Sequence, residues 1–202
     1  MRQTPANLNA LGQEFQIALS KADWTEALLL ADKLIALLPE NPSLAYNKGL
    51  VLKNLGRVPE SLACFQATLD LAPDHHNAQF ELAAALLESG QIEESARRFE
   101  DYLAAVPDDA DASLNLGIAL VQLGCAEAAL PHLGYAQSRL GSAQALQWLA
   151  TAKRDRGDLT AAEDLLAQLP ADDANAQAAR LKILTQGTKG RLALDTRQFR
   201  QH

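Results

Sequence analysis

The chain has 202 residues, which is enough for one domain with a substantial apolar core. Its net charge of -7 argues against a nucleic-acid partner, because phosphate backbones are bound by basic surfaces. Aromatic residues make up only 5% of the sequence, while alanine and leucine are abundant. This composition is typical of helices packed through small and medium side chains.

Two further features bear on the compartment. The first residues, MRQTPANLNALGQEF, lack the apolar stretch of a signal peptide, and the longest apolar run, residues 82–87, is too short to cross a bilayer. Cys64 and Cys125 form no CxxC pair, so the spacing indicates neither a disulfide framework nor a zinc site. We expect a cytoplasmic protein in which one thiol is buried, at Cys64, and Cys125 lies in a turn.

A period of 34 residues runs through most of the chain. Prolines, turn glycines and small residues all recur at this interval: Pro5, Pro39, Pro73 and Pro107; Gly56, Gly90 and Gly124; Ala27, Ser61, Ser95 and Ala129. A fixed period of this length is typical of stacked helical repeats. Such a stack presents a long concave surface rather than a pocket ringed by catalytic groups.

In chain order, residues 1–7 are expected to be an N-terminal extension. Repeat units follow at 8–41, 42–75, 76–109, 110–142 and 143–170. Each unit has two segments of helical period, helix A and helix B, joined by a glycine that can adopt the left-handed conformation. A helix over 171–186 is expected to cap the stack, with Asp172 or Asp173 at its N-terminus and Gly187 at its end. Residues 187–202 form a basic tail.

This pattern resembles the tetratricopeptide repeat family over roughly residues 8 to 170. The resemblance rests on three positions, counted from the first residue of each unit. Positions eight and twenty hold small residues, and position twenty-four holds a large apolar residue. These positions hold Gly49, Ala83, Gly117 and Ala150; Ala27, Ser61, Ser95, Ala129 and Ala162; and Phe65, Phe99, Leu133 and Leu166. The resemblance implies an all-α fold, a right-handed α-solenoid of about five tetratricopeptide helix pairs plus a C-terminal capping helix.

Three departures from the family pattern are informative. Glu14 and Lys48 occupy a position that is normally apolar, and two interpretations stay open: the charges pair across adjacent A helices, or Lys48 extends to solvent. Pro131 lies inside the fourth helix B, where we expect a kink or a late helix start. The fourth unit ends in Gly141 instead of proline, so we expect the stacking angle to change there.

In this family the partner lies along the A helices, and the resemblance places the groove of this chain on the same stripe. We expect its middle to be apolar and open, because other positions supply the core. Two asparagines can hold a main chain, although asparagine is also simply common there in the family. The expected groove residues are Tyr46, Asn47, Leu50, Lys53, Phe80, Ala84, Leu87, Leu114, Asn115, Ile118 and Val121.

Chaperone-binding members of the family hold a C-terminal carboxylate with basic residues at positions that are not basic here. The nearest cation is Lys53, one turn away, and Glu81 would repel a carboxylate. We therefore expect an amphipathic helix or an apolar segment as ligand. Phe80→Arg together with Leu114→Arg should then abolish partner binding with helicity intact.

Catalytic motifs are missing from the sequence: there is no P-loop, GxGxxG, HExxH or GxSxG. We expect no enzymatic activity, no cofactor and no metal. His75 and His76 are adjacent on a loop, but two ligands do not make a metal site, and a solvated loop is the simpler interpretation.

The favoured function is a scaffold or adaptor that binds a protein or peptide segment, chaperone-like in assembly or secretion, with no nucleic acid and no membrane. Low lysine and high alanine contents favour a bacterial source. A self-assembling unit is one alternative, because the tail carries a charge of +3 and the apolar residues Leu192, Ala193, Leu194 and Phe199. A regulatory subunit of an enzyme on another chain is the other. The simplest interpretation of the tail itself is a disordered end.

Overall fold

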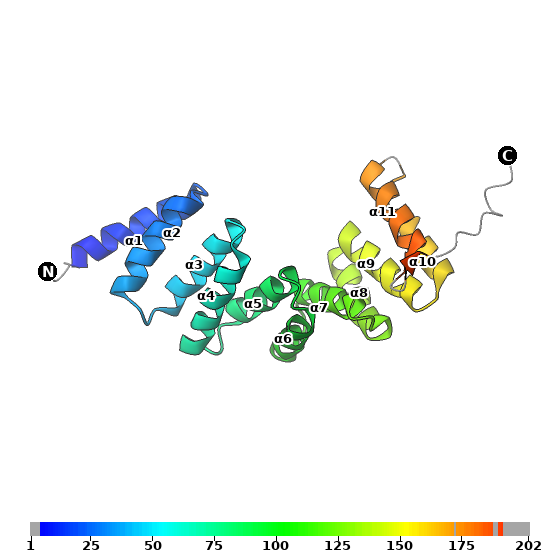
Figure 1. Cartoon of the computed structure of the whole chain (residues 1–202), viewed down its shortest axis with the longest axis horizontal. Coiled ribbons are helices and arrows are strands. Elements are labelled where there is room, and N and C mark those ends of the chain that lie inside the picture. The colour runs from blue at the N-terminus through cyan, green and yellow to red at the C-terminus, as the bar shows by residue number, and fades with distance from the viewer. Residues whose placement is uncertain (1–4, 172, 188–189, 192–202) are drawn as a thin grey trace. The chain divides into compact units, whose positions relative to one another are not determined.

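The computed structural model describes residues 5–171, 173–187 and 190–191. Within them, eleven α-helices follow one another and a short pair of strands follows the last helix (Figure 1). This confirms the all-α fold class. The first four residues of the expected N-terminal extension and most of the expected basic tail lie outside the described residues.

The chain divides into two compact bodies, an N-terminal body of Met1–Arg98 and a C-terminal body of Phe99–His202. The division falls inside α6 (Ile92–Ala105). Consecutive helices of the N-terminal body pack on one another, α1 on α2, α2 on α3, α3 on α4 and α4 on α5. Their bounds are α1 (Pro5–Ser20), α2 (Trp24–Leu37), α3 (Pro42–Asn54), α4 (Val58–Leu71) and α5 (His76–Glu88).

Left-handed residues link the helices within each hairpin. Gly56 has φ 72°, Gly90 80°, Gly124 77° and Gly157 97°, as the turn glycines were expected to have. In the first hairpin the same place is taken by Ala22, with φ 54°. It is the only residue other than glycine with positive φ among those described, and its Cβ makes this conformation costly.

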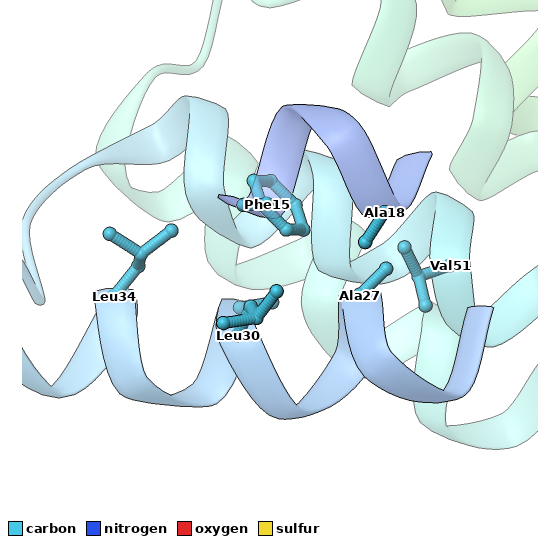
Figure 2. Close-up of a cluster of buried hydrophobic side chains, with 7 residues drawn as sticks. Phe15, Ala18, Ala27, Leu30, Leu34 and Val51 are labelled. Atoms are coloured by element: carbon cyan, nitrogen blue, oxygen red, sulfur yellow. The ribbon is translucent and has the colours of Figure 1, made fainter. Parts of the chain in front are cut away.

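Large and small residues interlock where helices of one hairpin meet. A Cβ built on Gly49 would lie 2.5 Å from a ring carbon of Phe65, so only glycine fits beneath this ring. The first hairpin reverses the arrangement: its large residue, Phe15, comes from α1, and the small Ala31 comes from α2. Figure 2 shows Phe15 in this cluster beside Leu30 and Leu34.

Charge pairing in the N-terminal body differs from both expectations for Lys48. Lys48 Nζ lies 2.7 Å from Asp32 Oδ1, so the expected pairing with Glu14 is wrong. The reason is that α2 packs directly on α3, which brings Asp32 within reach. Glu14 is exposed and makes no ion pair within the described part of the chain.

In the C-terminal body, α7 packs on α8, α8 on α9 and α9 on α10, and α11 covers both α9 and α10. The bounds are α7 (Ala110–Gln122), α8 (Ala126–Leu140), α9 (Ala143–Asp155), α10 (Leu159–Leu166) and α11 (Ala174–Thr185). Strand β1 (Gln186–Gly187) pairs antiparallel with β2 (Gly190–Arg191). Helix α8 runs through Pro131 from Ala126, so a late helix start is wrong.

Helix α11 covers the last apolar face of the stack. Ala176 and Ile183 of α11 are buried in one cluster with Leu146, Ala150 and Leu166 of α9 and α10. The carboxylate of Asp173 accepts a hydrogen bond from the Asn175 N–H at 2.9 Å, so Asp173 caps the helix, while Asp172 lies outside the described residues. The helix ends at Thr185, two residues before the expected Gly187.

Candidate functional site

Seven of the expected groove residues lie on α3 and α5 of the N-terminal body. Each is half-buried and so presents part of its side chain to solvent: Tyr46, Asn47, Leu50, Lys53, Phe80, Ala84 and Leu87. Tyr46 and Leu50 also pack against a buried cluster that contains Phe65 and Leu82. The core therefore fixes their positions while part of each remains on the surface.

A salt bridge crosses from α3 to α5 beside these residues. Lys53 Nζ lies 2.6 Å from Glu81 Oε2, and both side chains are half-buried, so water screens the pair less than it would on an open surface. Lys53 is thus engaged by Glu81 and is not a free cation for a terminal carboxylate.

Tyr46 contacts two other rings. Its ring centroid is 6.0 Å from that of Phe65 and 4.8 Å from that of His75. Burial raises the pKa of the Tyr46 phenol, and the negative charge of Glu81 raises it further. His75 Nδ1 accepts a hydrogen bond from the Ala78 N–H at 3.1 Å and thereby caps α5. His75 is therefore half-buried and structural, which corrects the expectation of a solvated loop.

A groove of about 830 Å³ runs between α1 and α3, within the ~300–1,000 Å³ typical of ligand pockets. We call it the α1–α3 groove. It is lined by one side of α1 from Leu8 to Ile17, by Ser43, Leu44 and Asn47 of α3, and by Leu34, Leu38 and Asn41. None of the described residues that line it carries a charge.

Amide groups and apolar groups share this lining. Phe15 and Leu34 are buried and belong to the core beneath it. The hydrogen-bonding side chains are Asn9, Gln13, Gln16, Asn41, Ser43 and Asn47. Since an amide both donates and accepts hydrogen bonds, such a lining can engage the N–H and C=O groups of an extended main chain.

Gly12 explains why the groove opens here. The same unit position holds Tyr46 and Phe80 in the next two repeats, whereas a Cβ built on Gly12 would meet nothing within 4 Å. From the sequence we placed the centre of the binding surface further along the chain, where the large apolar residues are. The signal for this groove was a missing side chain among amides spaced along one side of α1.

Exposed apolar side chains gather around the groove. Ile17 is 51% exposed and Leu38 is 37% exposed, and both line it. A second hollow of about 520 Å³ adjoins the groove. Leu38 and Asn41 line both, and Leu37 and Glu40 line the second hollow. Large apolar groups gathered on an otherwise polar surface indicate an interface.

The expected groove residues of the C-terminal body are differently placed. Leu114 and Ile118 are each only 6% exposed, and Val121 is 3% exposed, so these side chains are not open to a partner. Helix α7 is buried on nearly every side, which corrects the expectation that other positions alone supply the core. Asn115 is half-buried. An arginine at Leu114 would therefore disturb folding rather than test binding.

A buried ion pair lies beneath α11 in the C-terminal body. Arg154 Nη2 is 2.6 Å from Asp155 Oδ1, and the two side chains are 7% and 4% exposed. Arg154 Nη1 also donates to the Ile183 carbonyl at 2.6 Å, which joins α9 to the C-terminal end of α11. Within the described part of the chain, Asp155 Oδ2 has no hydrogen-bond partner, so the carboxylate depends there on Arg154.

Two further groups of the C-terminal body have shifted pKa values. Burial raises the pKa of Tyr102 to about 12, and the hydrogen bond from its hydroxyl to Asp109, 2.8 Å long, raises it too. Burial lowers the pKa of His132, and Glu100 opposes this shift. Among the described side chains, no three His, Cys, Asp or Glu groups are arranged to hold a metal ion. In that same part of the chain, no helix has the length and apolar character of a membrane span.

Comparisons with known proteins agree with this architecture. Tetratricopeptide repeat family models match residues 15–88 and 80–139, which together make up more than half of the chain. No curated protein matches.

Several solved structures share the fold. MamA from Desulfovibrio magneticus RS-1, from residue 41 to its end, is 22% identical with a TM-score of 0.76, covering 87% of this chain and 96% of that one. Another MamA crystal structure is 17% identical with a TM-score of 0.75, covering 95% and 99%. YrrB, described as a TPR protein with an unusual peptide-binding site, is 18% identical with a TM-score of 0.73, covering 83% and 88%.

Proposed function

Since the chain belongs to the tetratricopeptide repeat family, we propose that it is a non-catalytic scaffold that binds a segment of another protein in the α1–α3 groove. The half-buried residues of α3 and α5, from Tyr46 to Leu87, extend the binding surface. The observation that carries the proposal is the groove itself, which combines exposed apolar side chains with hydrogen-bonding amides and, among the residues that the structure describes, has no charged side chain in its lining.

The chemistry of the lining defines the ligand. Ile17 and Leu38 offer apolar area, and burying such area contributes about 25 cal/mol per Å² before the costs of ordering are subtracted. The amides of Gln13 and Asn47 satisfy main-chain groups that would otherwise be buried without partners. An extended segment with apolar side chains fits both requirements, and the peptide-binding site of YrrB is a precedent within the same fold.

We also propose a cytoplasmic role in assembly or secretion, chaperone-like in that the groove would shield an apolar segment of the partner. The two free thiols, half-buried Cys64 and exposed Cys125, suit a reducing compartment.

Affinity capture from cell extract with two matched variants tests the proposal. Ile17→Arg introduces a charge into the groove at a site that is 51% exposed, so the fold is preserved. Leu29→Arg makes the same change on α2 at a side chain that is 48% exposed and outside the groove lining. A partner retained by the wild type and by Leu29→Arg, but lost by Ile17→Arg, is expected. A partner lost equally from both variants, or from neither, would contradict the proposal.

A further inference from the structure

We infer that the α1–α3 groove binds the C-terminal segment of a second copy of this chain, residues 191–202, and so links copies head to tail. The inference rests on the proposed function, because it names an occupant for the same groove. Three properties of the groove and the segment support it: charge, apolar content and length.

The segment is basic, and no described residue of the groove lining repels it. Residues 191–202 carry Arg191, Arg197 and Arg200 against a single Asp195, a charge of +2, whereas the whole chain carries -7. Among the described residues, the lining of the α1–α3 groove has no cation, and the adjoining hollow contributes the carboxylate of Glu40. A basic segment therefore meets no like charge at this surface, and the acidic remainder of the chain attracts it.

Apolar residues of the segment match apolar residues at the groove. Leu192 and Leu194 are two positions apart and therefore share one side of an extended chain. Ile17 and Leu38 in the groove, and Leu37 in the adjoining hollow, are large apolar side chains more than a third exposed. Contact between these two sets removes apolar surface from water on both partners.

The lengths agree as well. Helix α1 has 16 residues and is therefore ~24 Å long. The stretch from Leu192 to Phe199 spans ~26 Å when extended at ~3.3 Å per residue. One segment is therefore long enough to cover the part of α1 that lines the groove, from Leu8 to Ile17, with its main chain on the amides of Asn9, Gln13 and Gln16.

Groove and segment are different surfaces of one chain, so the contact is heterologous. Each copy that accepts a segment still offers its own, and such contacts build open chains unless their rotation closes a ring. The mass of the wild type should therefore rise with concentration above the 21.7 kDa of one chain.

Light scattering on the full chain and three variants tests this. Ile17→Arg removes the groove and leaves the segment, while Leu192→Ser with Leu194→Ser removes the segment and leaves the groove. Both should remain at 21.7 kDa, whereas Leu29→Arg should associate like the wild type. Mixing the groove variant with the segment variant should produce a complex of two chains that grows no further, because one intact groove meets one intact segment.

A synthetic peptide of residues 190–202 provides the second measurement. It should bind the segment variant and should bind Ile17→Arg at least tenfold more weakly, and rising salt should weaken it. A wild type that stays at the mass of one chain overturns the inference, as does association that Ile17→Arg leaves unchanged. If the wild type stays monomeric while Ile17→Arg still loses a captured partner, the inference falls and the proposed function stands.

Discussion

Gly49 is the position at which the packing of the N-terminal body can be tested most sharply. Gly49→Ala combines two opposing effects. Alanine favours a helix over glycine by about 1 kcal/mol, and an extra methyl group in a filled site costs about 1–3 kcal/mol. The cost applies here because the new Cβ would lie 2.5 Å from the ring of Phe65, which is fully buried and has little room to move.

Gly12→Ala is the matched control. It has the same effect on helix propensity, but its Cβ meets nothing within 4 Å. The difference between the two variants therefore isolates the clash, and Gly49→Ala should be about 1–3 kcal/mol less stable than Gly12→Ala. Urea denaturation followed by far-UV circular dichroism measures this as a shift in midpoint at unchanged slope.

A rescue experiment completes the test. Phe65→Leu in the Gly49→Ala background recreates the pairing of Ala150 with Leu166, which are both fully buried in the fifth repeat. The double variant should recover part of the lost stability. Equal stabilisation by Gly49→Ala and Gly12→Ala would mean that α3 and α4 are not in close contact at Gly49, which would contradict the packing described above.

Three further predictions concern single side chains. Ala22→Gly should raise the free energy of unfolding by about 1 kcal/mol, because glycine adopts the left-handed conformation without strain, and urea midpoints measure it. Arg154→Met should lower it by about 3–5 kcal/mol in the same assay, because the buried Asp155 carboxylate loses its partner; a neutral result would contradict this. Tyr102 has a pKa of about 12 in the folded chain against 10.0 ordinarily. Its contribution to the free energy of unfolding is therefore complete below pH 10.0 and is lost as the pH rises towards 12. In urea titrations at a series of fixed pH values, Tyr102→Phe should lose less stability than the wild type as the pH rises from 10.0 towards 12.

The 34-residue period identifies the residues at which the helices of a hairpin meet, because each repeat needs a small and a large side chain at the same places to pack. Phe65 and Leu133 are fully buried against Gly49 and Gly117, as the large and small positions require. The first repeat departs from this pattern. There the large residue, Phe15, stands at the position that is small in the other repeats, and the small Ala31 stands at the large position, so the pair fills a similar volume.

The candidate site was harder to predict, because exposure depends on what lies over a residue. Leu114 and Leu50 both lie on the stripe of the A helices where the groove was expected, yet Leu114 is buried and Leu50 is partly exposed. The period does not predict ion pairs either. Lys48 bonds to Asp32 on the preceding helix B rather than to Glu14, its equivalent in the preceding repeat. The α1–α3 groove depends on the absent side chain of Gly12, which a search for large apolar residues passes over.

Site-specific photo-crosslinking can show whether this chain binds a protein segment in the α1–α3 groove. A photoreactive residue is placed at Gln13, in the groove lining, and in a second protein at Gln66, which is exposed on α4. We expect the photoreactive residue at Gln13 to capture a defined protein segment, identified by mass spectrometry, and Ile17→Arg to abolish the capture. Crosslinks that form from Gln66 alone, or that survive Ile17→Arg, would contradict binding in this groove.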